Sequence, residues 1–259
     1  MADTLLNIQF QEACATDMCP FCALTLSRTR RYLSRLLYEY ATAPDIHMRF
    51  ARAFGLCEWH GRMLVEVTEE ERSDGLAAAI LYETVLNQLL TTLDEIAPPQ
   101  PHRRAVGRHK PSTRLLHSQE TCPLCDFETR ADTDLIRTFV DELEASGLGN
   151  PLMQSYLRSA RACRPHLSML LSECRNRQTL KMPELVEGLV RDYRAALRAL
   201  ADTLSAFIAK HDYTRQSELP EAERESWIRA VELCGGGRHG PYRHSGTRHT
   251  PADNERRQQ

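Results

Sequence analysis

Four short motifs hold the residues whose types and spacing are best suited to chemistry. Two are Cys-Pro-x-Cys, at Cys19–Cys22 and Cys122–Cys125, and two are Cys-x-x-His, at Cys57–His60 and Cys163–His166. Two cysteines separated by two residues can direct both sulfurs at one ion. A cysteine and a histidine three residues apart on a helix share one face. Each half of the chain therefore offers three thiols and one imidazole, which is a standard ligand set for tetrahedral zinc.

The order of the motifs along the chain predicts which ligands share an ion. Each Cys-Pro-x-Cys is followed by one Cys-x-x-His after a similar interval, so we expect one ion in each half. All four positions around each ion would be protein ligands, which leaves no place for a water nucleophile and predicts structural zinc. An iron–sulfur cluster stays open as an alternative, because three cysteines and one histidine can also hold a cluster. The expected groups are Cys19, Cys22, Cys57 and His60, and Cys122, Cys125, Cys163 and His166.

Three of the nine cysteines lie outside these motifs. We interpret Cys174 as a core thiol, because the expected shells are already complete without it. Cys14 is interpreted as a partly buried thiol at the end of a first helix, with exchange into the first site as the alternative. Cys234 is interpreted as an unremarkable terminal cysteine, with a reactive exposed thiol as the alternative.

The elements that position the motifs are predicted to be helices, because apolar residues recur at intervals of three and four and no period-two strand appears. In each half a helix leads away from the Cys-Pro-x-Cys motif, and a shorter antiparallel helix returns to bring Cys-x-x-His back to it. A long amphipathic helix then closes the half. We predict an all-α fold of two pseudo-repeats packed into a bundle, with the two long helices sharing a common core. The predicted helices are 23–40, 45–54, 60–71, 76–96, 128–145, 152–162, one beginning at 163, 186–208 and 221–233.

Composition divides the chain into four parts. Residues 1–97 form the first Cys3His repeat, and residues 113–234 form the second. Between them, residues 98–112 are rich in Pro and basic side chains and are predicted to be a linker. Residues 235–259 are rich in Gly, Arg and His and are predicted to be a disordered tail.

Composition and cysteine usage favour a soluble protein of the cytoplasm. Hydrophobic residues make up 42% of the chain and charged residues 26%, which is ordinary for a globular protein. The first residues lack the pattern of a secretory signal, and an odd number of cysteines favours reduced thiols. We expect no membrane span, since no apolar run approaches the roughly 18 residues that one requires.

The charge distribution makes nucleic acid an unlikely partner. The expected folded parts are mildly acidic, and the positive charge is concentrated in the linker and the tail. The linker bases Arg103, Arg104, Arg108 and Lys110 have no aromatic residues beside them on which bases could stack.

An enzyme is the less favoured class. The chain has no Ser-His-Asp order, Gly-rich phosphate loop or paired-carboxylate motif. A pocket using His47, His117 or His211 stays open as an alternative, although such histidines are more often surface or capping residues. Glu58 and Trp59 are interpreted as supports for His60 rather than as catalytic groups.

The doubled motifs and the C-terminal region resemble an uncharacterised bacterial protein family with duplicated cysteine and histidine motifs. The resemblance covers about residues 10 to 235 and implies metal ligands at the eight motif positions. It implies no activity, and the tail after Gly235 departs from the family pattern. Its C-terminal part rests on His211-Asp212-Tyr213, Ser226-Trp227, Arg229-Ala230 and Glu232-Leu233.

Together these features favour a scaffold with two structural zinc ions that binds another macromolecule, most simply a protein, through grooves between its helices. The alternative is a redox or metal-handling protein that uses iron–sulfur clusters or oxidisable zinc thiolates.

Overall fold

The structure, a computed structural model, is helical throughout the residues that it describes. These are residues 4–16, 18–96, 117–118, 120–147, 149, 151–158, 162–177, 179, 182–210 and 220–236. The predicted linker 98–112 and all but the first two residues of the predicted tail 235–259 lie outside them. Every regular element in the described ranges is a helix, so the prediction of an all-α fold is confirmed.

The helix bounds agree with the predicted ranges to within a few residues. Prolines stand in the first turn of several of these helices, where their fixed φ fits the helix and no donor is lost. The elements are α1 (Thr4–Cys14), α2 (Pro20–Arg35), the π-helical η1 (Leu36–Tyr40), α3 (Pro44–Ala53), α4 (Glu58–Glu70), α5 (Leu76–Ile96), α6 (Pro123–Ser146), α7 (Pro151–Arg158), α8 (Arg164–Asn176), α9 (Met182–Lys210), α10 (Glu221–Arg224) and α11 (Ser226–Gly235).

The chain forms two compact units that do not follow the expected sequential halves. Unit 1 contains residues 1–24 and 133–259, and unit 2 is the continuous segment 25–132. The boundaries fall inside α2 and inside α6, so unit 2 is inserted into the sequence of unit 1.

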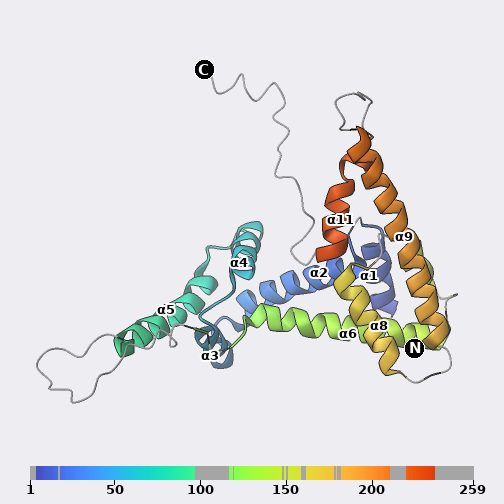
Figure 1. Ribbon diagram of the computed structural model, residues 1–259. Coiled ribbons are helices and arrows are strands. Elements are labelled where there is room, and N and C mark those ends of the chain that lie inside the picture. The colour runs from blue at the N-terminus through green and yellow to red at the C-terminus, as the bar shows by residue number, and fades with distance from the viewer. Residues whose placement is uncertain are drawn as a thin grey trace, which may run out of the picture. The chain divides into compact units, whose positions relative to one another are not determined.

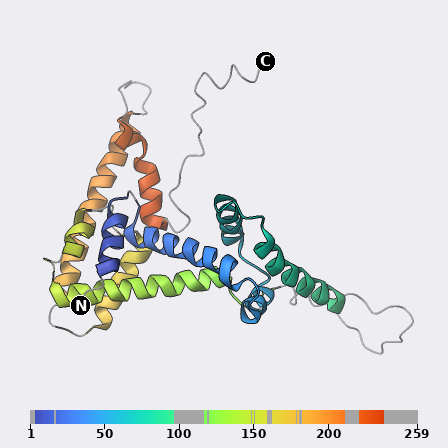
Figure 2. The same cartoon turned by 180° about the vertical axis from the view of Figure 1, so that it is seen from behind.

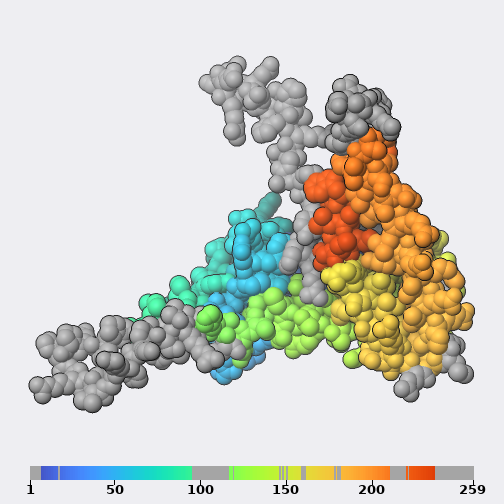
Figure 3. All heavy atoms as spheres, in the orientation of Figure 1, coloured from blue at the N-terminus to red at the C-terminus, as the bar shows by residue number. Residues whose placement is uncertain are grey.

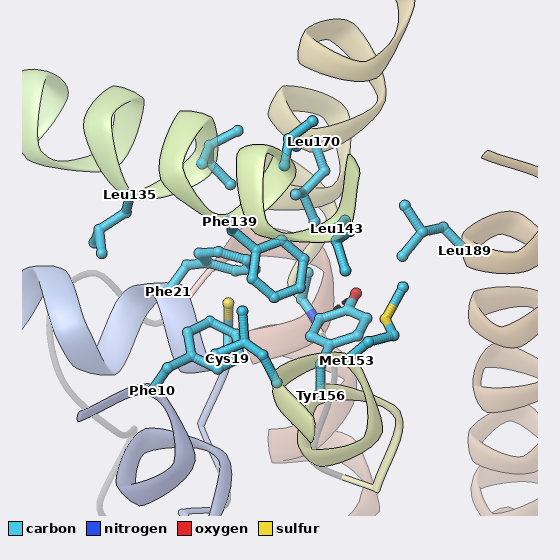
Figure 4. Packing of buried hydrophobic residues seen from close by; sticks show 14 of the residues in the cluster. Phe10, Cys19, Phe21, Leu135, Phe139, Leu143, Met153, Tyr156, Leu170 and Leu189 are labelled. Atoms are coloured by element: carbon cyan, nitrogen blue, oxygen red, sulfur yellow. Dashed lines mark hydrogen bonds between the residues drawn. The ribbon is translucent and has the colours of Figure 1, made fainter. Parts of the chain in front are cut away.

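The core of unit 1 is built around four aromatic rings (Figure 4). Phe10 of α1 stacks on Phe139 of α6 with ring centroids 4.9 Å apart, and Phe21 meets Phe139 edge-on at 5.3 Å. Tyr156 of α7 completes the group at 5.6 Å from Phe139. Cys19 belongs to the same buried cluster, so this core supports the first Cys-Pro-x-Cys motif directly.

The long helix α9 forms one wall of unit 1. It packs against α8, α10 and α11, and α11 lies along it in both ribbon views (Figures 1 and 2). Leu185 and Leu189 of α9 are buried in the unit 1 core. In the space-filling view the side chains of α8, α9 and α11 form one continuous surface (Figure 3).

Unit 2 contains two smaller apolar clusters. Leu33 of α2 packs with Met63 and Val67 of α4, and Phe50 of α3 packs with Leu81 and Val85 of α5. The long helices α5 and α9 therefore contribute to different cores among the described residues. The prediction that they share one common core is wrong, because the unit boundary assigns one to each unit.

Helix α5 is apolar on two faces. Leu81 and Val85 are buried in unit 2, whereas Leu86 and Leu90 are 58% and 59% exposed. Residues Leu76–Asp94 are, by length and composition alone, one helix among the described residues that is long and apolar enough to cross a membrane. The expectation that no apolar stretch reaches such a length is therefore wrong for α5.

Candidate metal centres

All eight predicted ligands lie at the N-termini of four helices. Cys57 is the N-cap residue of α4, and Cys163 is the N-cap residue of α8. Cys19 and Cys122 immediately precede α2 and α6, and their carbonyls accept the first helical hydrogen bonds. The second ligand of each motif is the third residue of its helix. Side chains at the N-cap and third helical positions converge on the same helix end, as they do in a capping box.

The first group of ligands, site 1, forms where the N-termini of α2 and α8 meet in unit 1. The Nδ1 atom of His166 lies 3.5 Å from the Sγ of Cys19, 3.4 Å from that of Cys22 and 3.2 Å from that of Cys163. The Cys22 and Cys163 sulfurs are 3.7 Å apart. All four residues are buried, and they could hold one metal ion.

The second group, site 2, forms where the N-termini of α4 and α6 meet in unit 2. The Nδ1 atom of His60 lies 3.3 Å from the Sγ of Cys57, 3.5 Å from that of Cys122 and 3.4 Å from that of Cys125. The Cys57 and Cys125 sulfurs are 3.7 Å apart. His60 is buried, but the three thiols are only partly buried.

The expected grouping of the ligands within each half is wrong. Each Cys-Pro-x-Cys motif shares a site with the Cys-x-x-His motif of the other half, so the groups cross between the two halves of the sequence. Between α3 and the Cys57 motif the chain turns at Phe54 and Gly55, which have φ values of 52° and 88°. Cys57 then meets Cys122 and Cys125 rather than Cys19 and Cys22.

Helix dipoles favour this arrangement of ligands. Each site lies at two helix N-termini, where the unpaired backbone N–H groups carry partial positive charge. Two such ends brought together would repel each other with neutral side chains between them. Negative charge on the cysteine sulfurs reduces this repulsion, and the same field favours the thiolate form.

Site 2 has a carboxylate beside its histidine. The Nε2 atom of His60 lies 3.1 Å from the Oε1 atom of Glu128, and both side chains are almost fully buried. Such a carboxylate fixes the ring so that Nδ1 faces the ion, and it strengthens the ligand. The two residues that the sequence analysis interpreted as supports for His60 have other contacts. Glu58 is exposed and pairs with Arg62, and Trp59 packs against the Leu33 cluster. The signal missed in the sequence is the position of Glu128, one helical turn after Cys125.

Site 1 is closed by the end of α11. Gly236 is buried with a φ of +87°, and a Cβ atom there would lie 3.4 Å from the Cys163 sulfur. The Arg164 side chain donates a hydrogen bond to the Cys234 carbonyl at 3.0 Å. The sequence prediction assigned this glycine to a tail, whereas its backbone covers the metal ligands.

With no ion bound, the site 2 ligands do not all ionise together. Burial raises the pKa of the Cys122 thiol, but hydrogen bonding to His60 outweighs it and lowers this pKa to about 6. Burial and the Cys122 charge raise the pKa of Cys125. Burial lowers the pKa of His60, but Cys122 and Glu128 outweigh it and raise this pKa to about 10. A bound cation must displace protons from Cys125 and His60, so metal affinity falls as pH falls.

In site 1, as in site 2, the pKa is lowered for one thiol and raised for others. Hydrogen bonds from Cys19 and Cys22 lower the pKa of Cys163. Hydrogen bonds with Cys163 and Cys19 raise the pKa of Cys22, and burial raises that of Cys19 to about 12. Three buried thiolates cannot coexist without a compensating cation. This group of side chains is therefore suited to a dication and poorly suited to being left without one.

The other cysteines singled out in the sequence lie outside both sites. Cys174 is fully buried in the unit 1 core, as expected. Cys14 is partly buried and packs against the same core, and Cys234 is exposed.

The histidines considered for an enzyme pocket do not come together among the described residues. His47 contacts the Thr84 hydroxyl at 2.6 Å and the Ala41 carbonyl at 2.7 Å, so it joins α3 to α5. His117 is exposed, and His211 lies outside the described residues.

The fold and the two sites define an all-α protein with two Cys3His centres that could each hold a metal ion. The chain belongs to the family described as a family of unknown function, DUF6062, which matches residues 1–240. The resemblance drawn from the sequence motifs is thereby confirmed. Neither the search of curated proteins nor that of solved structures gave a significant match.

Proposed function

We propose that the protein is a helical scaffold held together by two structural zinc ions and that it acts by binding another protein. The observation that carries the zinc assignment is the spacing of the ligand atoms. A tetrahedron with Zn–S bonds of about 2.3 Å and a Zn–N bond of about 2.05 Å has S···S edges of about 3.8 Å and S···N edges of about 3.6 Å. In the structure one S···S edge of 3.7 Å occurs in each site, and the S···N edges are 3.2–3.5 Å in site 1 and 3.3–3.5 Å in site 2.

These edges favour a single ion over an iron–sulfur cluster. A cluster places several iron atoms and sulfides between its ligands and requires the cysteine sulfurs to stand farther apart. Four protein ligands around one ion also fill the tetrahedral shell, which supports a structural role over a catalytic one.

The metal assignment predicts a stoichiometry and a spectrum. Protein purified without added metal is expected to contain two zinc ions per chain and to be colourless, because zinc has a filled d shell. Elemental analysis together with an optical spectrum of freshly isolated protein makes the test. Visible absorbance with iron and acid-labile sulfide would contradict the zinc assignment and favour the cluster.

The outer face of α5 supports the proposal of a protein partner. Leu76, Leu86, Leu90 and Leu93 are 48–61% exposed and repeat at the a and d positions of a heptad. Together with exposed Ala79 they form the α5 stripe. The opposite face of the helix is already buried in unit 2, and this second apolar face stays largely exposed among the residues that the structure describes.

The charges on α5 indicate the chemistry of the partner. Its only charged residues are the acids Glu83, Asp94 and Glu95, and Glu83 occupies an a position within the stripe. An anionic lipid surface would be repelled, and a second copy would supply no cation opposite Glu83. An amphipathic helix of another protein with a basic residue beside Glu83 fits both the stripe and its charge.

A photo-crosslinking amino acid in place of Leu86 tests the proposed partner in the cells that naturally produce the protein. It is expected to give an adduct whose mapped peptide is a helix with an apolar heptad and a Lys or Arg, and Glu83→Lys is expected to abolish the adduct. The matched control is the same label at Leu197 of α9, which is 41% exposed. An adduct with a second copy, with lipid, or equally from Leu197 would contradict the proposal.

One observation favours metal handling as a second candidate function at site 2. Its three thiols are partly exposed, whereas all four ligands of site 1 are buried. Accessible zinc thiolates can be oxidised by a peroxide to a disulfide, which gives water and releases the ion. Site 2 is therefore the more exchangeable of the two sites.

A further inference from the structure

A cavity in unit 2, separate from both metal sites, has the features of a ligand-binding pocket. Its volume is about 500 Å³, and it lies between the second part of α2, η1, the start of α3 and the start of α6. This volume is within the usual range for small-molecule sites. The residues that define its character are Arg28, Arg31, Arg35, Tyr32, Tyr40 and Phe127.

The cavity has an excess of positive charge. Arg28, Arg31 and Arg35 follow one another at intervals of three and four along α2, so their guanidinium groups share one face. Like charges at this spacing destabilise a helix unless an anion compensates them. Asp45 is the one acidic residue in the lining, and Glu39 binds Arg35 from outside it at 3.3 Å. Arg31 makes no hydrogen bond or ion pair with any residue that the structure describes.

A flat aromatic surface lies beside these arginines. The rings of Tyr32 and Phe127 are stacked, with centroids 4.2 Å apart and planes within 7° of parallel. Both residues are only half-buried and both line the cavity. A planar ring can extend such a stack, and this contact is favourable for any aromatic base.

The backbone of the cavity has an unusual conformation. Residues Leu36–Tyr40 form a π-helical segment directly after α2, and Tyr40 of this segment lines the cavity. Such segments are rare and occur frequently at functional sites. The π-helix therefore provides an observation independent of the charges.

We propose that this cavity binds a nucleoside phosphate. The base stacks on the Tyr32–Phe127 pair, and the phosphates accept hydrogen bonds from Arg28, Arg31 and Arg35. Guanidinium groups form paired, charge-assisted hydrogen bonds with phosphate oxygens, which makes arginine well suited to this role. The aromatic base and the phosphates of the ligand contact different parts of the cavity lining. A ligand that carries both is therefore expected to bind more tightly than either part alone.

Titration calorimetry on the full chain with its metal ions bound tests the proposal, with ADP, adenosine and pyrophosphate as separate probes. ADP is expected to bind with a dissociation constant below about 100 µM, and adenosine and pyrophosphate at least about 10-fold more weakly. Arg31→Gln is expected to weaken ADP binding about 10-fold or more, because it removes a charged hydrogen bond. Arg31 is exposed, so this variant leaves the fold intact.

Two further variants separate the base from the phosphates. Tyr32→Leu is expected to weaken ADP binding about 5-fold or more and to leave pyrophosphate binding unchanged, because only the base loses its stacking partner. Arg198→Gln, an exposed position on α9 outside the cavity, is expected to leave both unchanged. The proposal is overturned if ADP fails to bind at about 1 mM, if Arg31→Gln binds it normally, if pyrophosphate binds as tightly as ADP, or if short RNA displaces ADP at far lower concentration.

Discussion

Replacing Cys22 and Cys163 together with serine is expected to remove one zinc ion and leave the other. Replacing Cys22 and Cys57 together is expected to remove both. The first pair belongs to one site, and the second pair divides between the two sites. Grouping within each half predicts the reverse, so zinc analysis of these two double variants distinguishes the arrangements. Cys174→Ala, which alters a buried thiol outside both sites, should retain both ions and serves as the control.

The effect of these variants on stability is expected to be large. Zinc binding at a structural site contributes about 10–16 kcal/mol in small zinc domains, whereas whole domains are stable by only about 5–15 kcal/mol. Loss of the site 1 ion in Cys22→Ser, Cys163→Ser should therefore unfold unit 1, because the site 1 thiols belong to the same buried cluster as Phe21 and Phe139. Limited proteolysis should then cut the unit 1 helices and spare unit 2. A fully folded variant without its ion would contradict a structural role for the metal.

The zinc ion of site 2 is expected to be lost before that of site 1. Its thiols are partly exposed, so a chelator or peroxide can approach them, whereas site 1 is buried beneath Gly236. Release followed with a colorimetric zinc indicator should show two phases of equal amplitude. Lower pH should speed the early phase, since protons compete for Cys125 and His60. A single phase would show that the two sites are equally accessible.

The substitution Glu128→Gln tests the earlier loss of zinc from site 2 more specifically. The substitution keeps the size of the side chain but removes the charge that lies 3.1 Å from His60. The affinity of site 2 for zinc should fall by about 10- to 100-fold, as is usual when a partner of a ligating histidine is lost. The early phase should then accelerate while the late phase stays unchanged. Glu66→Gln, which alters an exposed carboxylate bonded to Arg30, is the matched control and should alter neither phase.

The eight residues that form the two candidate sites were predictable from the sequence, but their grouping was not. The Cys-x-x-His motifs are interchangeable as ligands, so their spacing alone gives no choice between partners. The helix lengths gave part of the information about this grouping. α2 has 16 residues and is about 24 Å long, whereas α3 has 10 and is about 15 Å long. In the second half, α6 has 24 residues and α7 only 8. The returning helices are thus too short to retrace the outgoing ones.

Two other features depend on contacts between residues distant in the sequence. Glu128 could be recognised as a support for His60 only when α4 and α6 were known to share a site. Gly236 lies in a Gly-rich stretch that resembles a solvated tail, and its burial depends on α11 packing against α8 and α9. Helical periodicity, in contrast, is local, which is why the elements themselves were predicted to within a few residues.

The crossed pairing imposes an order on assembly during synthesis. The ligands of site 2 are all available once residue 125 has been made, whereas Cys19 and Cys22 must wait until residue 166 emerges from the ribosome. Before Cys122 and Cys125 have been made, the nascent chain presents Cys57 and His60 as the nearest partners for Cys19 and Cys22. An ion bound by Cys19, Cys22, Cys57 and His60 together would be a kinetic trap. Ligand exchange with Cys122 and Cys125 must then resolve it.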